Sequence, residues 1–312
     1  MDDANQTSVS KFVLLGLSER QDLQPLVFTG LLATYLVNLI GNALLLGAVW
    51  ADTQLRSPMY FLLSQLAVVD MSFATITLPQ ALVHTLTQHR AVPFTSCMTQ
   101  LFFFLAVGSM EGYLLAVMAY DRYVAICNPL HYATVVTQPL CLKMVGVSWA
   151  VVTLHSLLHT FLAARLNYCG HRLQHFICDV APLLLLSCTR PFPNELAVFT
   201  EGVLVVVGPF AFILASYVRI GVTVGHLRSA HSLHKALSTC GSHLAVVTLF
   251  YGTVAWLYFR PASSYTLGRD RQVAVFYTAV APALNPLIYS LRNKEVAASL
   301  RKAGRKVLAL CA

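Results

Sequence analysis

Seven long apolar runs constrain the fold of this 312-residue chain more strongly than any other feature of its sequence. A helix needs about 20 apolar residues to cross the hydrocarbon core of a bilayer. Each run is continuous, whereas the strands of a membrane barrel alternate in polarity over about ten residues. The runs cover residues 26–50, 59–86, 101–119, 140–162, 196–224, 237–259 and 273–291. The sequence therefore predicts an all-α membrane protein, a seven-transmembrane helix bundle that forms a single domain over residues 1–312.

The overall composition agrees with a membrane protein. Hydrophobic residues make up 57% of the chain and charged residues only 11%, and the mean hydropathy is +0.65. A chain this apolar cannot hide its apolar surface in one soluble core. The net charge of +8 raises the alternative of a nucleic-acid partner, but no zinc-finger, RNA-recognition or helix-turn-helix signature interrupts the runs. We expect the lipid bilayer and no nucleic acid as a partner, with the basic charge facing anionic lipid.

The charges in the loops predict the orientation. The side reached after an odd number of runs carries twelve basic and three acidic residues, and the other side carries nine basic and seven acidic residues. The positive-inside rule then places the N-terminus outside the cell. Asn5 begins a glycosylation sequon on that outer side. No cleavable signal peptide is expected because residues 1–11 are polar. The prediction is a multi-pass plasma-membrane glycoprotein with an extracellular segment 1–25 and a cytoplasmic tail 292–312.

A charged motif follows the third run. An arginine in the middle of a bilayer costs on the order of 3 kcal/mol, so Arg122 should lie where the helix leaves the membrane, with Asp121 or Tyr123 as its partner. Together with Met118–Tyr132, four segments, namely residues 41–42, 58–62, 235–240 and 282–293, carry a resemblance that extends over nearly the whole chain. The sequence closely resembles vertebrate odorant receptors, which are rhodopsin-like G-protein-coupled receptors.

This resemblance implies a sensory receptor. Such a receptor would bind a small volatile odorant within the outer half of the bundle, activate the olfactory stimulatory heterotrimeric G protein and raise cyclic AMP. A membrane enzyme is not expected, because the chain shows no nucleophile with its base and no His-Glu-x-x-His motif. A transporter or channel is not expected either, because no inverted repeat, pair of broken helices or pore filter is visible.

The resemblance also assigns a G-protein switch. Pro286 removes a backbone donor and loosens the last helix, which permits movement there. The tyrosines near the inner ends of runs five and seven, Tyr217 and Tyr289, would meet Arg122 when the bundle opens. The alternative is that they are ordinary tyrosines of the membrane interface. The predicted switch comprises Asp121, Arg122, Tyr123, Tyr217, Asn285, Pro286 and Tyr289.

Four polar residues lie inside four different apolar runs: Asp70, Glu111, Asn42 and Asn285. Acids inside a membrane need partners, protons or ions, and a shared interior site would satisfy all four. The resemblance implies a sodium pocket formed by these residues, in which oxygen atoms hold a hard cation. The alternative is that one carboxyl group is protonated and hydrogen-bonded to the other. No further cofactor is expected.

The ligand pocket is predicted by resemblance alone, and its mostly apolar lining with a few hydrogen-bonding groups would suit a small volatile molecule. Glu201 is the unusual member: it would recognise an amine or hydroxyl group, or pair with His155 or His159. These histidines stand at i and i+4 on one helix face and are either packing residues or zinc ligands. The predicted lining residues are Phe104, Leu105, Gly108, Ser109, Glu201, Val205, Tyr251, Val254, Tyr258 and Thr278.

Four of the eight cysteines lie on the predicted outer side, where disulfides form. The resemblance implies the pairs Cys97–Cys178 and Cys169–Cys188, although the spacing does not determine the connectivity. His175, Cys178 and Asp179 also stand close enough in sequence for a metal site. At the other end of the chain, apolar and basic residues alternate with near-helical spacing over 293–308, which predicts a short amphipathic C-terminal helix on the inner leaflet. The alternative for this segment is a frayed basic tail.

Overall fold

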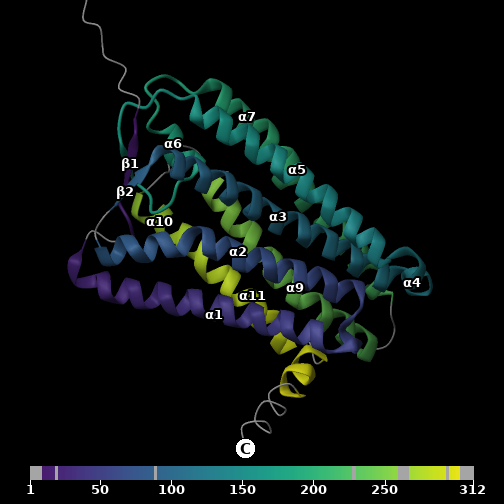
Figure 1. The fold of residues 1–312 in the computed structure, drawn as a ribbon. Coiled ribbons are helices and arrows are strands. Elements are labelled where there is room, and N and C mark those ends of the chain that lie inside the picture. Colours follow the sequence, from purple (N-terminus) through teal and green to yellow (C-terminus); the bar gives the residue numbers. More distant parts are fainter. Residues whose placement is uncertain are drawn as a thin grey trace, which may run out of the picture.

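The computed structural model describes residues 9–17, 20–87, 90–226, 230–258, 267–292 and 295–302. Long helices run side by side along one axis and form a single bundle, with β1, β2, α6 and α10 at one end and α4 at the other (Figure 1). The first four long helices are α1 (Gln24–Ala51), α2 (Pro58–Thr87), α3 (Phe94–Cys127) and α5 (Gln138–Ala164). They contain the first four predicted runs, and α3 extends beyond its run (residues 101–119) at both ends.

The remaining runs are helical as well, but two of them change their hydrogen-bonding pattern midway. The fifth run comprises α7 (Phe192–Gly202), the π-helical turn η4 (Val203–Val207) and α8 (Gly208–Gly225), and the sixth is α9 (Ala230–Tyr258). The seventh comprises α10 (Leu267–Val275), the π-helical turn η6 (Phe276–Val280) and α11 (Ala281–Arg292). Each π-helical turn ends just before a proline, Pro209 or Pro282, which cannot donate to the helix ladder.

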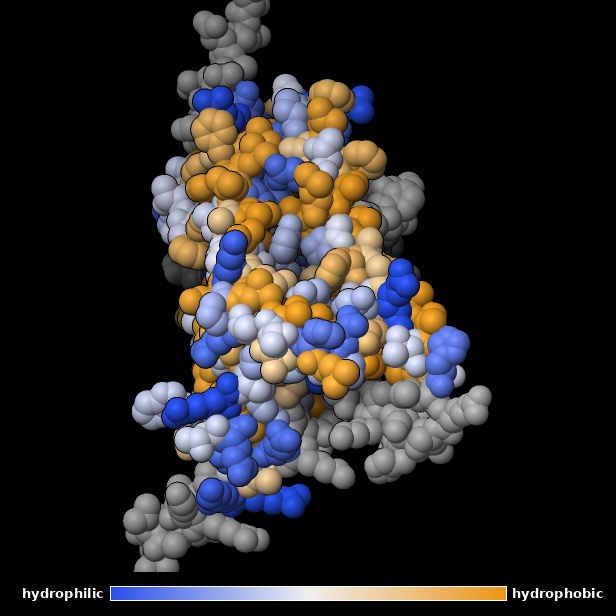
Figure 2. Space-filling model, turned by 90° about the vertical axis from the view of Figure 1, so that its right-hand side faces the viewer, coloured by the Kyte–Doolittle hydropathy of each residue, from blue (hydrophilic) through white to orange (hydrophobic). Residues whose placement is uncertain are grey.

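Within the described residues, six helices are long and apolar enough to cross a membrane, and the broken seventh completes the bundle. The α3 helix is central, because 67% of its apolar window is buried, against 22% for α1 and 17% for the fifth helix. The outer helices expose large apolar side chains such as Leu44, Phe199 and Leu204. Figure 2 shows hydrophobic residues over much of one face and hydrophilic ones gathered toward the end near the C-terminus. This distribution is that of a protein surrounded by lipid.

A small sheet covers one end of the bundle, and it was not predicted because its strands are only two to four residues long. The β1 strand (Lys11–Leu14) pairs antiparallel with β2 (Ala91–Pro93) and parallel with β3 (Arg172–Leu173). Phe12 and Leu14 of β1 are fully buried, and the ring of Phe12 meets that of Tyr168 edge-on at 5.1 Å. The β1 residues ahead of the first span are therefore packed into a cap.

Two disulfides hold this cap. The structure joins Cys97 near the start of α3 to Cys178, and Cys169 to Cys188, the pairs that the resemblance implied. The short helix α6 (Val180–Leu184) follows Cys178 directly, and Asp179 caps it by accepting from the Val180 N–H. The cap is thereby fixed to the end of the central helix.

Short elements complete the chain. The turns η1 (Gln21–Leu23), η2 (Thr53–Leu55) and η3 (Pro129–His131) and the helix α4 (Tyr132–Val135) connect the long helices. Residues 295–302 are helical, with Val296 buried and Arg301 and Lys302 exposed, as expected for an amphipathic helix. The Tyr60 hydroxyl donates to the carboxylate of Glu295. The rest of the predicted helix over 293–308, like Asn5, lies outside the described residues.

Candidate functional site

Three helices bring a group of polar side chains together in the middle of the bundle. The Asn285 amide nitrogen on α11 lies 3.1 and 3.0 Å from the two carboxylate oxygens of Asp70 on α2. The same nitrogen lies 3.2 Å from Oε1 of Glu111 on α3. All three residues are at most 2% exposed. Three of the four residues predicted from their place in apolar runs thus share one interior site.

The site has an excess of acceptors. Asn285 has only two N–H donors for three carboxylate oxygens, and within the described residues no Lys, Arg or His forms an ion pair with Asp70 or Glu111. Two neighbouring carboxylates in such surroundings require a proton or a cation. Both predictions made for this pair are compatible with its geometry.

Asn42 and a residue that the sequence analysis missed, Asn38, extend the polar group along α1. The Asn42 amide donates to the Asn38 carbonyl at 3.1 Å, and the Asn38 amide lies 3.4 Å from the Asp70 backbone carbonyl. No hydrogen bond joins Asn42 to either carboxylate among the described residues. The side-chain oxygens of Asn38 and Asn285 are buried and have no hydrogen-bond partner in the part of the chain that the structure describes. The sequence signal for Asn38 was available, since it is a second amide one turn before Asn42 in the same apolar run.

At the inner end of α3, Arg122 is held within its own helix. Its Nε lies 3.9 Å from the Asp121 carboxylate, and its guanidinium contacts the sulfur of Met59 on α2. The other Asp121 oxygen accepts from the Tyr132 hydroxyl at 2.7 Å. Burial, and then the Asp121 carboxylate beside it, raise the pKa of Tyr132, so this hydroxyl stays a donor. The sequence analysis named Tyr132 only as the last residue of a motif, whereas in the structure its hydroxyl binds the Asp121 carboxylate.

Tyr217 and Tyr289, the two tyrosines of the predicted switch, do not contact Arg122 by a hydrogen bond among the described residues. The Tyr217 hydroxyl on α8 lies 2.7 Å from Nδ1 of His243 on α9, and Nε2 of His243 lies 3.0 Å from the Leu115 carbonyl on α3. The Tyr289 hydroxyl is buried and has no hydrogen-bond partner among the described residues. His243 was missed by the sequence analysis, although a histidine within an apolar run is a recognisable signal.

Tyr123 packs in a small apolar cluster at the same inner end. Buried Ile220 and Val224 of α8 and Cys240 of α9 form the cluster, and Tyr123 and Tyr217 lie against it. Asn285 and Pro286 lie further up α11, with Asn285 in the carboxylate site and Pro286 inside the helix. The seven predicted switch residues therefore occupy two places, the inner end of the bundle and its middle.

Side chains fill the outer half of the bundle at the level of Phe104 and Gly108. The Phe104 ring stacks on Phe73 with centroids 5.2 Å apart, and Tyr277 meets Phe73 edge-on at 5.1 Å. A Cβ atom at Gly108 would lie 2.8 Å from the Tyr277 hydroxyl oxygen and 3.1 Å from the Phe73 ring. Only glycine fits at this position without movement of its neighbours.

The other predicted pocket residues differ in their contacts. The Tyr251 hydroxyl donates to the Gly112 carbonyl at 3.3 Å, and the Thr278 hydroxyl donates to the Ala274 carbonyl at 2.8 Å. Val205 and Val254 are buried, whereas Leu105, Ser109 and Glu201 are partly buried. The Tyr258 side chain lies outside the described set. Glu201 contacts His155 and His159 between α7 and α5.

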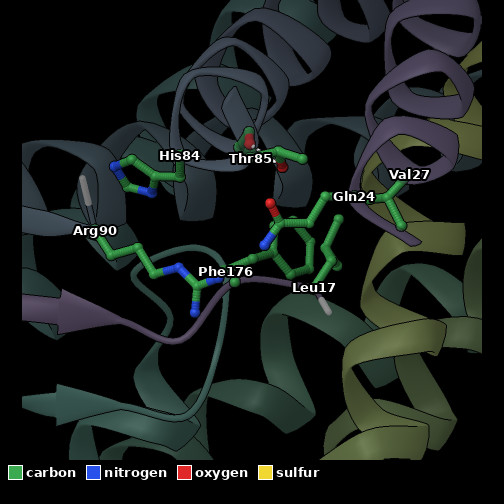
Figure 3. A pocket seen from close by; sticks show the side chains of 9 residues that line it. Leu17, Gln24, Val27, His84, Thr85, Arg90 and Phe176 are labelled. Atoms are coloured by element: carbon green, nitrogen blue, oxygen red, sulfur yellow. Dashed lines mark hydrogen bonds between the residues drawn. The ribbon is translucent and has the colours of Figure 1, made fainter. Parts of the chain in front are cut away.

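An open pocket lies at the capped end, away from the predicted lining. Figure 3 shows Arg90 and Phe176 facing Gln24 and Leu17 across it, with His84 and Thr85 on α2 behind. The Arg90 guanidinium is fixed there by donating to the Leu15 carbonyl at 2.8 Å. None of the ten predicted ligand residues lines this pocket.

The apolar helix bundle and its lipid-facing surface define a multi-pass membrane protein. A protein-family model with the description olfactory receptor matches residues 31–306 of the chain. Olfactory receptor 1f45 of Rattus norvegicus is 48% identical over 97% of this chain and 97% of its own length. Olfactory receptor 1J1 of Homo sapiens is 47% identical over 97% of this chain and 94% of its own length. The chain belongs to the olfactory receptor family, whose members are receptors and not enzymes.

Proposed function

We propose that this olfactory receptor, placed in the plasma membrane with its N-terminus outside, binds a small volatile odorant and activates the olfactory stimulatory G protein, which raises cyclic AMP. The observation that carries the proposal is the state of the inner end. Arg122 is held by Asp121, and Tyr217 is bonded to His243 instead of Arg122. This arrangement describes a closed receptor in which the arginine is not yet free to meet a partner.

Activation is then a shift between two populations of the bundle. The bond from Tyr217 to His243 stabilises the closed population because it links α8 to α9, and through Leu115 to α3. When α8 and α9 move apart from α3, Tyr217 would be released toward Arg122. The buried hydroxyl of Tyr289, which lacks a partner here, would gain one in the open population.

Asn285 and Pro286 would couple the middle of the bundle to this movement. Pro286 interrupts the hydrogen-bond ladder of α11, and Asn285 in the preceding position holds both carboxylates. A displacement of α11 therefore changes the contacts of Asp70 and Glu111. Ligands can shift such an equilibrium only through different contacts in the two states.

A sodium ion fits the carboxylate site chemically. Oxygen atoms of Asp70 and Glu111 would hold the ion, and the side-chain oxygen of Asn285, which has no hydrogen-bond partner among the described residues, would become a further ligand once its amide turns. Asn42 would need to turn, because its amide donates to the Asn38 carbonyl. The ion would supply the positive charge that the surrounding side chains do not.

The odorant would enter the outer half of the bundle near Phe104, Gly108 and Tyr251, where the lining is apolar with a few hydroxyl groups. Rings fill this region in the present structure, so binding requires the rings around Gly108 to move apart. An amine-bearing odorant that used Glu201 would have to compete with His155 for the same carboxylate.

The test is a cyclic AMP response in cells that express the full chain with the olfactory G protein. An odorant panel of amines, alcohols, aldehydes, ketones and acids identifies an agonist, and Arg122→Gln should then abolish the response at equal surface expression. The matched control is Arg172→Gln, since Arg172 is exposed on β3 at the capped end. An agonist response that Arg122→Gln leaves intact would contradict the proposal.

A further inference from the structure

Two histidines and a glutamate converge between α5 and α7, apart from the carboxylate site. Nδ1 of His155 lies 2.8 Å from Oε2 of Glu201, and Nε2 of His159 lies 3.4 Å from the same oxygen. One ligating atom from each residue lies within 4.8 Å of the others. This is the one group of three or more His, Cys, Asp or Glu with such spacing in the part of the chain that the structure describes.

The helix geometry brings these atoms together. His155 and His159 stand one turn apart on α5, so their rings lie on the same face with centroids 4.5 Å apart. Glu201 comes from the last turn of α7 on the neighbouring segment. Side-chain exposures of 12%, 4% and 27% leave the group shielded but open on the glutamate side.

The two spacings to Glu201 are close to those of a tetrahedral metal centre, and the two histidine nitrogens, within 4.8 Å of each other, would close toward the ion. Zinc binds histidine nitrogen and carboxylate oxygen at about 2.0–2.2 Å, so two ligand atoms of a tetrahedron lie roughly 3.4 Å apart. The spacing between His159 and Glu201 already has this value, and the spacing between His155 and Glu201 needs to widen by a fraction of an ångström. We propose that His155, His159 and Glu201 form a zinc site that joins α5 to α7.

The donor set favours zinc for three reasons. Imidazole nitrogen suits zinc and copper, and hard cations such as magnesium and calcium prefer oxygen ligands. Two histidines with one glutamate leave a fourth position for water, as in open zinc sites. Zinc also has no geometric preference from its d electrons, so a site between two helices with imperfect angles can hold it.

The other set with metal-ligand spacing is already used within the cap. Cys178 is in a disulfide with Cys97 and Asp179 caps α6. The His175 ring nitrogen Nδ1 accepts from the Ile177 N–H. Since these three ligands are engaged, the group on α5 and α7 is the better candidate for a zinc ion among the described residues.

Zinc at this place would fasten the outer end of the fifth helix. α7 continues directly into the π-helical turn η4, which contains Val205 of the predicted odorant pocket. A bound ion would therefore restrict movement of α7 against α5. The proposal goes beyond odorant recognition, and its test measures zinc binding without any odorant.

The experiment uses the full chain, purified without a polyhistidine tag and reconstituted in lipid nanodiscs, with zinc chloride as the probe. Wild type should bind one zinc ion per receptor, and Co²⁺ in its place should give the visible absorption of a tetrahedral centre. Glu201→Gln keeps an acceptor for His155 but removes the charge, and His159→Gln removes a ligand. Each should weaken zinc binding by at least the roughly tenfold that even outer-shell changes cause.

Two controls make the result decisive. His84→Gln alters a histidine at the outer end of α2, outside the three-residue group, and should leave the zinc affinity unchanged. His159→Cys replaces one zinc ligand by another and should restore binding, which shows that the variant folds. Absence of zinc binding by wild type would overturn the proposal, as would zinc affinity that survives both Glu201→Gln and His159→Gln.

Discussion

The Tyr217 hydroxyl and Nδ1 of His243 lie 2.7 Å apart, so one histidine connects three helices of the bundle. Because Nε2 of the same ring faces the Leu115 carbonyl at 3.0 Å, a neutral ring satisfies both contacts. Nε2–H donates to the carbonyl, and Nδ1 accepts from the tyrosine. His243 is 2% exposed, so water does not compete for either bond. Helices α8, α9 and α3 are thus joined near the inner end by a single side chain.

Replacing His243 by phenylalanine should raise the basal activity of the receptor. The change removes two hydrogen bonds that hold α8 and α9 to α3, each worth about 1 kcal/mol net. The combined loss of about 2 kcal/mol shifts the closed-to-open ratio by roughly thirtyfold. The measurement is cyclic AMP without odorant, normalised to surface expression. Leu244→Ala, on the exposed side of the same helix, is the matched control, and equal basal activity in both variants would refute the assignment.

Gly108→Ala should destabilise the receptor, whereas Gly146→Ala should not. A methyl group at Gly108 would lie too close to Tyr277 and Phe73, while nothing lies within 4 Å of a Cβ at Gly146. Overpacking of this kind costs about 1–3 kcal/mol, and alanine in an open helix position gains up to about 1 kcal/mol over glycine. Thermal unfolding of the two purified variants beside wild type measures the difference. Equal melting temperatures for the two variants would show that the rings are free to move away.

Acid should destabilise the capped end through His175, which lies in the loop outside the spans. Burial, and to a smaller extent the Arg271 charge, lowers the pKa of His175 to about 4 against the opposing effect of Asp270. The unfolded state has the ordinary pKa near 6.5 and binds the proton more readily. Stability from neutral His175 is therefore complete above about pH 6.5 and is lost as the pH falls toward 4, about 3 kcal/mol in all.

The pH series should separate His175 from exposed histidines. In His175→Gln the unfolding free energy should fall by about 3 kcal/mol less than in wild type between pH 6.5 and 4. His171→Gln, which changes an exposed neighbour, should follow wild type. The assignment fails if the His175→Gln curve keeps the full decline.

Sodium should stabilise the wild-type receptor relative to choline at equal ionic strength. The ion would neutralise Asp70 and Glu111, which share the single amide of Asn285. Binding to the folded state alone raises the free energy of unfolding by mass action. Asp70→Asn should remove this dependence, and Asp22→Asn at the exposed outer end should keep it. Melting temperatures that are identical in sodium and choline would favour a shared proton instead.

The spans could be predicted because bilayer thickness imposes one length on every apolar run. The ends of the helices could not be predicted in this way. α3 begins at Phe94 rather than 101, because the polar residue Gln100 is satisfied by other parts of the structure. Its amide donates to Gln80 at 2.6 Å, and its carbonyl accepts from the Cys178 N–H at 3.0 Å. A search for apolar runs ends the helix at such a polar residue, because it cannot detect hydrogen-bond partners in a distant loop.

The site shows the same limit. Asp70, Glu111 and Asn285 were found from sequence because acids and amides inside apolar runs must meet partners. The partner of Tyr217 was not found, because pairing it with His243 depends on how α8 packs on α9. The strands of the cap were not predicted for a similar reason, since β1 and β3 pair across more than 150 residues of chain. Long-range pairing of short segments leaves no local pattern in a sequence.

The most direct test of the account is nucleotide exchange on the purified olfactory stimulatory G protein by receptor in nanodiscs, with an agonist from the odorant panel. Wild type should accelerate binding of a non-hydrolysable GTP analogue when the agonist is present. Arg122→Gln should show no acceleration, and His243→Phe should show acceleration without agonist. Exchange that is unaffected by agonist in wild type, or that survives in Arg122→Gln, would contradict the central claim that this receptor signals through Arg122.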